Sequence, residues 1–186
     1  MSENIIIIGA SGAIGSSFIN YYINQNPSNI IYSLSRKEIK YSNDNIKNVL
    51  IDIEDEQTIV SAAGICSEHG SFDKIIVATG ILHDENLSPE KSFRHLEKNK
   101  LERVFSVNTF GPAMIARYFI PLLNKEKTSF FGVLSARVGS ISDNKIGGWY
   151  SYRASKAALN MIIKSLSIEV ARNNPNAIIV GLHPGT

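Results

Sequence analysis

The stretch "NIIIIGASGAIG", residues 4–15, sets the architecture of this chain. Its run of isoleucines ends in glycine and predicts a buried strand, and the apolar spacing that follows predicts a helix over 12–25. Gly9, Gly12 and Gly15 lie between the two. In a βα unit, three such glycines allow a tight turn, close approach of the backbone to a phosphate, and close packing of helix on strand. The stretch therefore predicts a pyrophosphate-binding turn that faces the positive end of the helix dipole.

Other features of this turn leave alternatives open. The glycines could form a tight βα turn and nothing more. Ser11 could donate to a phosphate oxygen, cap the helix, or do both. We expect Ala13, Ile14 and Gly15, which begin the helix, to contact the same pyrophosphate-containing cofactor. No Lys-Ser/Thr pair follows the glycines, which excludes a P-loop.

Apolar runs alternate with helix-length amphipathic segments along the rest of the chain. This alternation predicts one α/β domain over 1–186: a doubly wound parallel sheet of about six strands in a three-layer αβα arrangement. A TIM barrel would need eight βα units. A ligand crevice is expected at the carboxyl ends of the strands. The expected elements are strands at 4–10, 29–35, 47–53, 72–80, 129–136 and 176–185, helices at 12–25, 55–69, 99–124 (interrupted near Gly111-Pro112) and 150–172, and a short helix opening at Pro89.

The composition excludes several functional classes. The chain has 44% hydrophobic and 19% charged residues, as a soluble globular domain does. A net charge of +2 with no dense Lys/Arg cluster argues against a nucleic-acid partner. The run at residues 5–10 is too short to span a membrane, and a single cysteine, Cys66, fits a reducing compartment, so we expect a cytoplasmic protein with no membrane partner. The four histidines are dispersed, so no metal is expected.

The end of the second strand indicates which dinucleotide is preferred. Ser35 and Arg36 stand there, without an acidic residue before Glu38. A carboxylate would accept from the ribose 2′-hydroxyl of NAD, whereas a guanidinium can grip a 2′-phosphate with two hydrogen bonds. The sequence therefore favours NADP(H), with NAD(H) possible. The alternative is that Arg36 is an ordinary solvated cation.

Tyr152 and Lys156 form the candidate catalytic pair. Residues four apart share one face of a helix, so both side chains can reach a common site. A cation beside a phenol stabilises the phenolate and lowers its pKa from about 10 toward the working range. Such a tyrosine can donate a proton to a carbonyl oxygen or remove one from an alcohol. The alternative is a surface pair on an amphipathic helix.

These motifs, in this order, resemble the short-chain dehydrogenase/reductase family, in particular its C-factor-type and sniffer-type carbonyl reductases. The resemblance spans the whole chain. It implies that Tyr152 is the acid/base, that Lys156 also holds the nicotinamide ribose, and that Asn108 in "VNTFG" supports a proton relay. Asp52, with Ile53 beside it, would hold the adenine. The remaining cofactor contacts implied by the resemblance are Ala78, Thr79 and Gly80 in "ATG", and Pro184, Gly185 and Thr186 in "HPGT".

The same resemblance implies a function and partners. We expect an NAD(P)H-dependent oxidoreductase that interconverts a carbonyl and an alcohol on a small-molecule substrate. A homodimer or homotetramer is expected through the helices at 99–124 and 150–172. A signalling or regulatory protein that binds the cofactor with little turnover is the alternative. An epimerase or dehydratase would need a larger C-terminal substrate domain.

Two departures from the family pattern stand out. The family places a substrate-binding serine at the end of the fifth strand. Alignment by the strand puts that position at Ala136, next to Ser135, whereas the usual spacing from the tyrosine puts it at Gly139, next to Ser140. Ser135 and Ser140 therefore both remain candidates. The chain also ends at Thr186, before the family's substrate loop and last strand, which makes strand 176–185 a sheet edge. We expect a fragment; the alternative is that a partner covers this edge.

Overall fold

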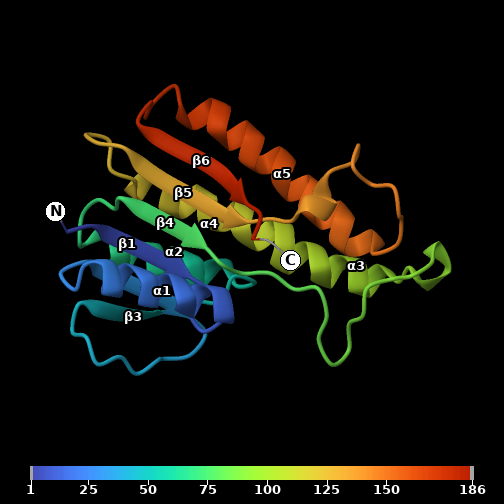
Figure 1. Cartoon of the computed structure of the whole chain (residues 1–186), viewed down its shortest axis with the longest axis horizontal. Coiled ribbons are helices and arrows are strands. Elements are labelled where there is room, and N and C mark those ends of the chain that lie inside the picture. Colours follow the sequence, from blue (N-terminus) through green and yellow to red (C-terminus); the bar gives the residue numbers. More distant parts are fainter. Residues whose placement is uncertain (1, 185–186) are drawn as a thin grey trace.

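The computed structural model describes residues 2–184, which contain one parallel sheet (Figure 1). Its strands are β1 (Asn4–Ile8), β2 (Ile30–Ser35), β3 (Ile46–Leu50), β4 (Lys74–Val77), β5 (Ser129–Leu134) and β6 (Ala177–Leu182). Their order is β3-β2-β1-β4-β5-β6, with every neighbouring pair parallel. This confirms the doubly wound sheet and places β6 at an edge. The connections reverse direction between β1 and β4, where such sheets open a ligand crevice.

Helices cover both faces of the sheet. They are α1 (Ala13–Gln25), α2 (Glu56–Ser67), α3 (Lys98–Phe105), α4 (Gly111–Phe119) and α5 (Tyr150–Val170). Ile5 and Ile7 of β1 pack toward α1, whereas Ile6 and Ile8 pack toward α2, α4 and α5. Successive strand residues point to opposite faces, so a strand covered on both sides needs an unbroken apolar run.

The helix expected over 99–124 is two helices with a π-helical turn, Ser106–Phe110, between α3 and α4. A 3₁₀ turn, Ile120–Leu122, ends the segment. The interruption thus lies just before Gly111, where an added Cβ would come 3.0 Å from the backbone oxygen of Ile53. The wider π turn keeps its three central residues buried.

Two other expectations about the elements are corrected. The helix expected to open at Pro89 does not form, and between β4 and α3 the only helical element is a 3₁₀ turn, Phe93–His95. Glu90 is instead turned inward and buried against the start of α5. The strand expected over 72–80 contains only Lys74–Val77 as β4, because its last residues leave the sheet to line the cleft described below.

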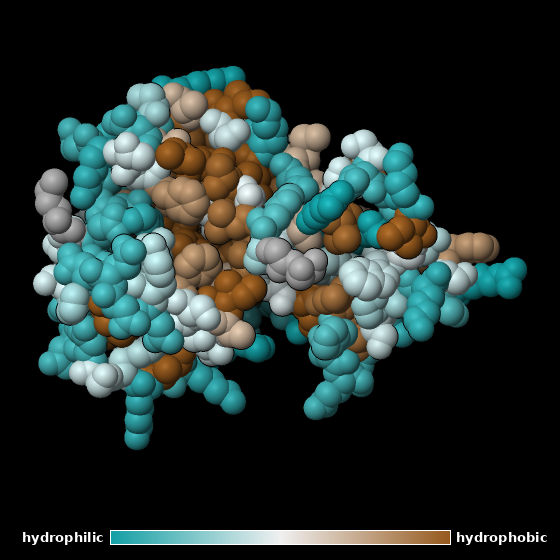
Figure 2. All heavy atoms as spheres, viewed as in Figure 1, coloured by the Kyte–Doolittle hydropathy of each residue, from teal (hydrophilic) through white to brown (hydrophobic). Residues whose placement is uncertain are grey.

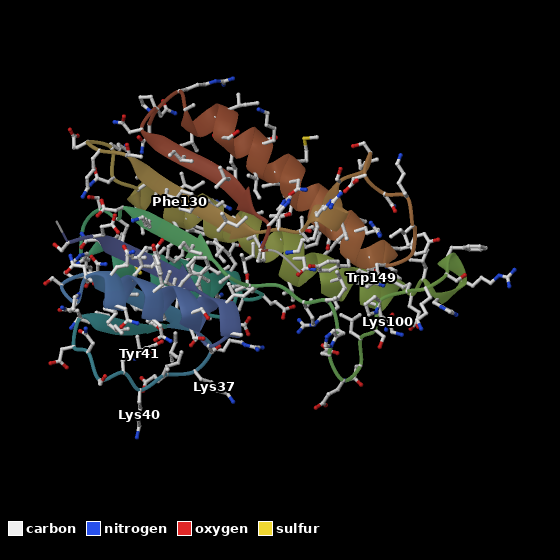
Figure 3. All side chains as sticks on the ribbon, in the orientation of Figure 1. Lys37, Lys40, Tyr41, Lys100, Phe130 and Trp149 are labelled. Atoms are coloured by element: carbon white, nitrogen blue, oxygen red, sulfur yellow. The ribbon has the colours of Figure 1, made fainter. Side chains whose placement is uncertain are left out.

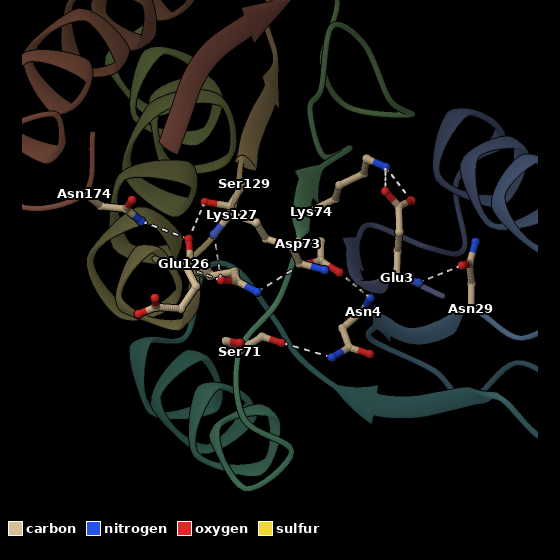
Figure 4. Close-up of polar contacts among 11 residues, drawn as sticks. Glu3, Asn4, Asn29, Ser71, Asp73, Lys74, Glu126, Lys127, Ser129 and Asn174 are labelled. Atoms are coloured by element: carbon tan, nitrogen blue, oxygen red, sulfur yellow. Dashed lines mark hydrogen bonds and ion pairs between the residues drawn. The ribbon is translucent and has the colours of Figure 1, made fainter. Parts of the chain in front are cut away.

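A polar network ties the amino ends of the strands together (Figure 4). The Asp73 carboxylate, 6% exposed, accepts from the backbone N–H of Asn4 at 3.1 Å and from Asn124 Nδ2 at 3.3 Å. Lys127 Nζ lies 2.9 Å from the same carboxylate. Asn174 Nδ2 donates to the backbone oxygen of Asn124 at 3.1 Å. The segments at the starts of β1, β4, β5 and β6 are therefore linked through partly buried hydrogen bonds.

Part of the sheet face beside α1 stays open. Phe130 and Ile178 are register partners on β5 and β6, and Ile178 is 46% exposed. Figure 2 shows apolar side chains gathered beside α1, and Phe130 is labelled on β5 in Figure 3. No helix within residues 2–184 is long and apolar enough to cross a membrane.

Candidate active site

A cleft of about 250 Å³ opens at the carboxyl ends of the central strands. Ten of the residues assigned to the cofactor line it: Gly9, Ser11, Gly12, Ser35, Arg36, Asp52, Ile53, Ala78, Thr79 and Gly80. The sequence did not point to six further lining residues, which are Ile8, Ile51, Glu54, Ile81, Arg103 and Val107. The cleft therefore gathers residues that follow four different strands, as the switch point of a doubly wound sheet does.

The three glycines of the turn have different surroundings. Gly9 has φ +85°, and a Cβ there would lie 2.8 Å from the backbone oxygen of Ala78. A Cβ on Gly15 would lie 2.2 Å from the backbone oxygen of Gly9, so α1 packs directly on the turn. A Cβ on Gly12 would meet only the Gly9 oxygen, at 3.4 Å, and would otherwise project into open space at the cleft. The fold itself needs Gly9 and Gly15, whereas Gly12 keeps clear a space that a phosphate could occupy.

The start of α1 differs from one of the expected arrangements. The N-cap residue is Gly12 and no side chain caps the helix, so Ser11 does not act as the cap. Ser11 lines the cleft, while Ala13, Ile14 and Gly15 form the first turn of α1 behind it. Backbone N–H groups of an uncapped first turn attract anions. This end of the cleft therefore fits a phosphate group.

Polar groups along the cleft wall also fit a polar ligand. The Thr79 hydroxyl is buried and has no hydrogen-bond partner in the part of the chain that the structure describes. Arg36 is exposed at the cleft, and its guanidinium makes no ion pair with residues 2–184. Asp52 accepts from the backbone N–H of Glu54 at 3.1 Å, and its own backbone N–H donates to Thr58 at 2.9 Å. An unpartnered buried hydroxyl carries an energetic cost that a ligand could relieve.

An ion pair that the sequence did not indicate joins two walls of the cleft. The Arg103 guanidinium of α3 donates to Glu54, which follows β3, and Ser106 Oγ donates to the same carboxylate at 3.1 Å. The Glu54 carboxylate raises the pKa of Arg103. These partners are 49 residues apart in the sequence, so no local pattern could reveal them.

Asn108, in the π turn, is held on both sides. Its Oδ1 accepts from the backbone N–H of Ile81 at 2.7 Å, and its Nδ2 donates to the backbone oxygen of Ile81 at 2.8 Å. Nδ2 also lies 3.2 Å from Ser155 Oγ, and the side chain is fully buried. The amide thereby ties the segment after β4 to the helix that carries Tyr152 and Lys156.

The Tyr152–Lys156 pair does not line the cleft but lies next to its Gly80 end. A Cβ on Gly80 would lie 3.4 Å from both Lys156 Nζ and Asn108 Oδ1. Lys156 is 2% exposed and donates to the backbone oxygen of Leu134 at 2.8 Å. Its Nζ lies 5.9 Å from the centroid of the Tyr152 ring. The structure thus brings Tyr152, Lys156, Asn108 and Gly80 together.

The protonation of this pair differs from the expectation. Burial raises the pKa of the Tyr152 phenol above its usual value near 10. Burial also lowers the pKa of Lys156, to about 8. Burial is the cause of the raised pKa of Tyr152, although the Lys156 ammonium lies over the ring, 5.9 Å from its centroid. Tyr152 is therefore protonated at neutral pH, which suits a proton donor.

The two serine candidates lie in different surroundings. Ser135 is 5% exposed, and its hydroxyl donates to Asn160 Oδ1 at 2.6 Å. Ser140 lies in the loop after β5 and accepts from the backbone N–H of Asp143 at 3.3 Å. A Cβ on Gly139 would come 2.8 Å from the backbone of Lys156, so a serine does not fit there. The Ser135 hydroxyl keeps only its acceptor capacity for a substrate.

The remaining assigned residues lie outside the cleft or outside the described residues. Pro184 follows β6 and is exposed. Gly185 and Thr186 lie outside the residues that the structure describes. Within residues 2–184, no three His, Cys, Asp or Glu side chains converge to hold a metal ion.

The sheet order, the glycine turn and the cleft define a Rossmann-type α/β protein of the dinucleotide-binding class. The family model described as short chain dehydrogenase matches residues 3–186. The chain therefore belongs to the short-chain dehydrogenase family, as its motifs predicted. Members of this family use NAD(P) for oxidation and reduction.

Two curated relatives illustrate the range of this family. The chain is 29% identical over 136 residues to a 1-hydroxy-2-glutathionyl-2-methyl-3-butene dehydrogenase of Rhodococcus sp. (strain AD45). This match covers 73% of the chain and 56% of the relative. The chain is also 36% identical over 86 residues to the C-signal protein of Myxococcus xanthus, and this second match covers 46% of the chain and 50% of the relative. The chain thus matches about half the length of each of these two proteins.

Two solved structures share the fold. The NADPH-bound carbonyl reductase from chicken fatty liver superposes with a TM-score of 0.84 at 21% identity, covering 99% of this chain and 76% of that one. The Sniffer protein of Caenorhabditis elegans superposes with a TM-score of 0.85 at 19% identity, covering 100% and 86%. These likenesses support the fold.

Proposed function

We propose that this protein is an NADP(H)-preferring oxidoreductase that interconverts a small-molecule carbonyl and its alcohol. The observation that carries the proposal is the half-buried Tyr152 beside Lys156 and Asn108, next to the Gly80 end of a cleft that begins at the glycine turn. Membership of a family of NAD(P)-dependent oxidoreductases supports it.

The roles of the residues follow from their positions. A bound nicotinamide cofactor supplies or accepts the hydride. Tyr152 donates the proton to the carbonyl oxygen in reduction, and Lys156 favours the phenolate that remains. Asn108 fixes the segment after β4 against α5. Either Ser135 or Ser140 binds the substrate oxygen; Ser135 would first have to release Asn160.

The preference for NADP(H) rests on Arg36. Its guanidinium is exposed at the cleft and unpaired within residues 2–184, next to Ser35, whose hydroxyl donates to the backbone oxygen of Lys37. A free guanidinium can bind a phosphate with two hydrogen bonds. The fold shared with an NADPH-bound carbonyl reductase is consistent with this preference.

We also propose a cytoplasmic homodimer or homotetramer that associates through the helices of 99–124 and 150–172. Phe110 and Met161 in these segments are 57% and 66% exposed, so they offer apolar surface to a second copy. Light scattering at micromolar concentration tests the assembly, and a strictly monomeric species contradicts it.

The enzymatic proposal is tested by following oxidation of NADPH and NADH against a panel of aldehydes and ketones, with the full-length gene product. We expect turnover of at least one carbonyl, faster with NADPH than with NADH at equal concentration. Absence of turnover across the panel, with cofactor binding intact, contradicts this function.

A cofactor-binding signalling protein with little turnover is the second candidate. Donation of the Ser135 hydroxyl to Asn160 favours it, because a substrate oxygen needs a donor, and so does the similarity to C-signal. It predicts NADPH binding by calorimetry without turnover of any carbonyl. A cellular activity that Tyr152→Phe leaves unchanged would favour this candidate over the enzyme.

A further inference from the structure

The turn that precedes the Tyr152 helix has an unusual backbone. Gly147, Gly148 and Trp149 have φ values of +70°, +66° and +52°, so three consecutive residues are left-handed. Trp149 is the N-cap residue of α5, and no side chain of its own turn caps the helix. A left-handed non-glycine residue costs about 1–2 kcal/mol and persists only where its surroundings hold it.

Glu90 supplies the missing contacts from a distant segment. Its backbone oxygen accepts from the Trp149 N–H at 2.5 Å. Its carboxylate accepts from the Ser151 N–H at 3.2 Å and from the Ser151 hydroxyl. Glu90 is 4% exposed, and a Cβ on Gly148 would lie 3.4 Å from its backbone oxygen. A carboxylate at this position satisfies an N–H of the first turn and complements the helix dipole.

The segment that carries Glu90 reaches α5 from across the molecule. Figure 1 shows the chain after β4 passing along α3 toward the N-terminal end of α5, where Trp149 is labelled in Figure 3. Glu90 and Ser151 are 61 residues apart in the sequence. The contact therefore joins the segment after β4 to the helix that carries Tyr152.

Tyr152 depends on this contact more than Lys156 does. Lys156 lies in the second turn of α5 and is fixed by its own hydrogen bond to Leu134. Tyr152 directly follows Ser151 in the first turn, where helices fray. Its ring packs edge-on against Trp149, with centroids 6.3 Å apart. Movement of the turn would therefore displace the phenol while the ammonium stays in place.

We infer that Glu90 is a positioning residue: it holds the left-handed turn and the first turn of α5, and so sets where the Tyr152 phenol lies relative to Lys156. The inference rests on the proposed function, in which Tyr152 donates the proton. Glu90 does not line the cofactor cleft, so its effect is expected on proton transfer and not on NADPH binding.

The test compares three variants of the full-length protein. Glu90→Ala removes the carboxylate contacts. Glu90→Gln keeps the shape, since its Oε1 can accept from the Ser151 N–H and its Nε2 can donate to the Ser151 hydroxyl. Glu85→Ala is the matched control, because Glu85 is an exposed carboxylate in the same segment. Trp149 is the sole tryptophan of the chain, so intrinsic emission reports on the turn directly.

Emission gives a readout that does not depend on turnover. Under conditions in which the variant is folded, Glu90→Ala is expected to shift the Trp149 emission to longer wavelength and to increase the quenching of this emission by acrylamide. Glu90→Gln restores both, and Glu85→Ala changes neither. Unchanged emission in folded Glu90→Ala overturns the inference.

Kinetics give the second readout. Glu90→Ala is expected to lower kcat for carbonyl reduction by about tenfold or more, with the KM for NADPH within about twofold, because misplacement of a catalytic group reduces kcat. Glu90→Gln recovers most of kcat. A kcat per folded molecule equal to wild type assigns Glu90 a purely structural role and overturns the inference. If the wild type turns over no carbonyl, the proposed function fails, and emission alone decides whether Glu90 holds the turn.

Discussion

Replacement of Lys156 by methionine tests the electrostatics of the site through stability. Lys156 is 2% exposed, and burial lowers its pKa from 10.5 to about 8. Between these two pH values the folded state binds fewer protons than the unfolded state. The free energy of unfolding of the wild type therefore rises with pH across this window. Methionine has a similar length and cannot titrate, so Lys156→Met lacks this rise.

The size of the effect follows from the pKa change. Each pH unit between the two pKa values is worth about 1.36 kcal/mol, which sets an upper limit of about 3 kcal/mol for the full window. Between about pH 7 and pH 9.5, the wild type should gain about 2 kcal/mol relative to Lys156→Met. The variant also leaves the Leu134 oxygen without its donor, which costs about 1–3 kcal/mol at every pH. The diagnostic quantity is consequently the pH dependence of the difference.

Urea unfolding of both proteins at several pH values measures this quantity. Tyr22 and Cys66, whose pKa values burial raises to about 12, lower the stability of both proteins at high pH and cancel in the difference. Lys164→Met, at an exposed position on the same helix, is the control and should follow the wild type at every pH. Parallel stability curves for the wild type and Lys156→Met would refute the lowered pKa and the charge state assigned to the site.

Three further predictions concern the turn, the cofactor and the fold. Gly15→Ala should destabilise the protein by about 1–3 kcal/mol in urea unfolding, because the added Cβ would meet the backbone of the turn. Gly64→Ala in α2 has free space for the Cβ and should stabilise the protein by about 0.5–1 kcal/mol. Similar effects of the two substitutions would contradict the close packing of α1 on the turn. Arg36→Ala should raise the KM for NADPH by about tenfold and leave the KM for NADH within about twofold of the wild-type value. Equal changes in the two KM values would show that Arg36 does not bind the 2′-phosphate. Asp73→Ala should destabilise the protein by about 2–3 kcal/mol, because a buried carboxylate loses its partly buried hydrogen bonds. Asp143→Ala at the surface should leave the unfolding midpoint unchanged, and equal midpoints for the two variants would show that the network contributes little.

Local patterns were sufficient to predict the fold and one end of the cleft. The isoleucines of β1 are buried on both faces, and a strand of this kind shows in sequence as an unbroken apolar run. Gly9, Gly12 and Gly15 follow that strand at once, so the strand, the turn and the start of the helix are contained in twelve residues. The Tyr152–Lys156 spacing is equally local, because helix periodicity alone puts both on one face.

The features that the sequence did not reveal depend on contacts between distant segments. Glu90 reaches Ser151, and Glu54 pairs with Arg103, only because the sheet order brings their segments together. The raised pKa of Tyr152 likewise depends on burial, which residue spacing does not encode. The spacing of Tyr152 and Lys156 predicted that the two side chains lie together, whereas their protonation states depend on how the site is packed.

The central claim is that Tyr152 is the proton donor of a carbonyl reduction. The most direct test is Tyr152→Phe, with NADPH oxidation measured on a carbonyl that the wild type reduces and with NADPH binding measured separately by calorimetry. The account predicts a loss of turnover of about 10²–10⁴-fold, with the Kd for NADPH within about twofold of wild type. Near-wild-type turnover by Tyr152→Phe would contradict it.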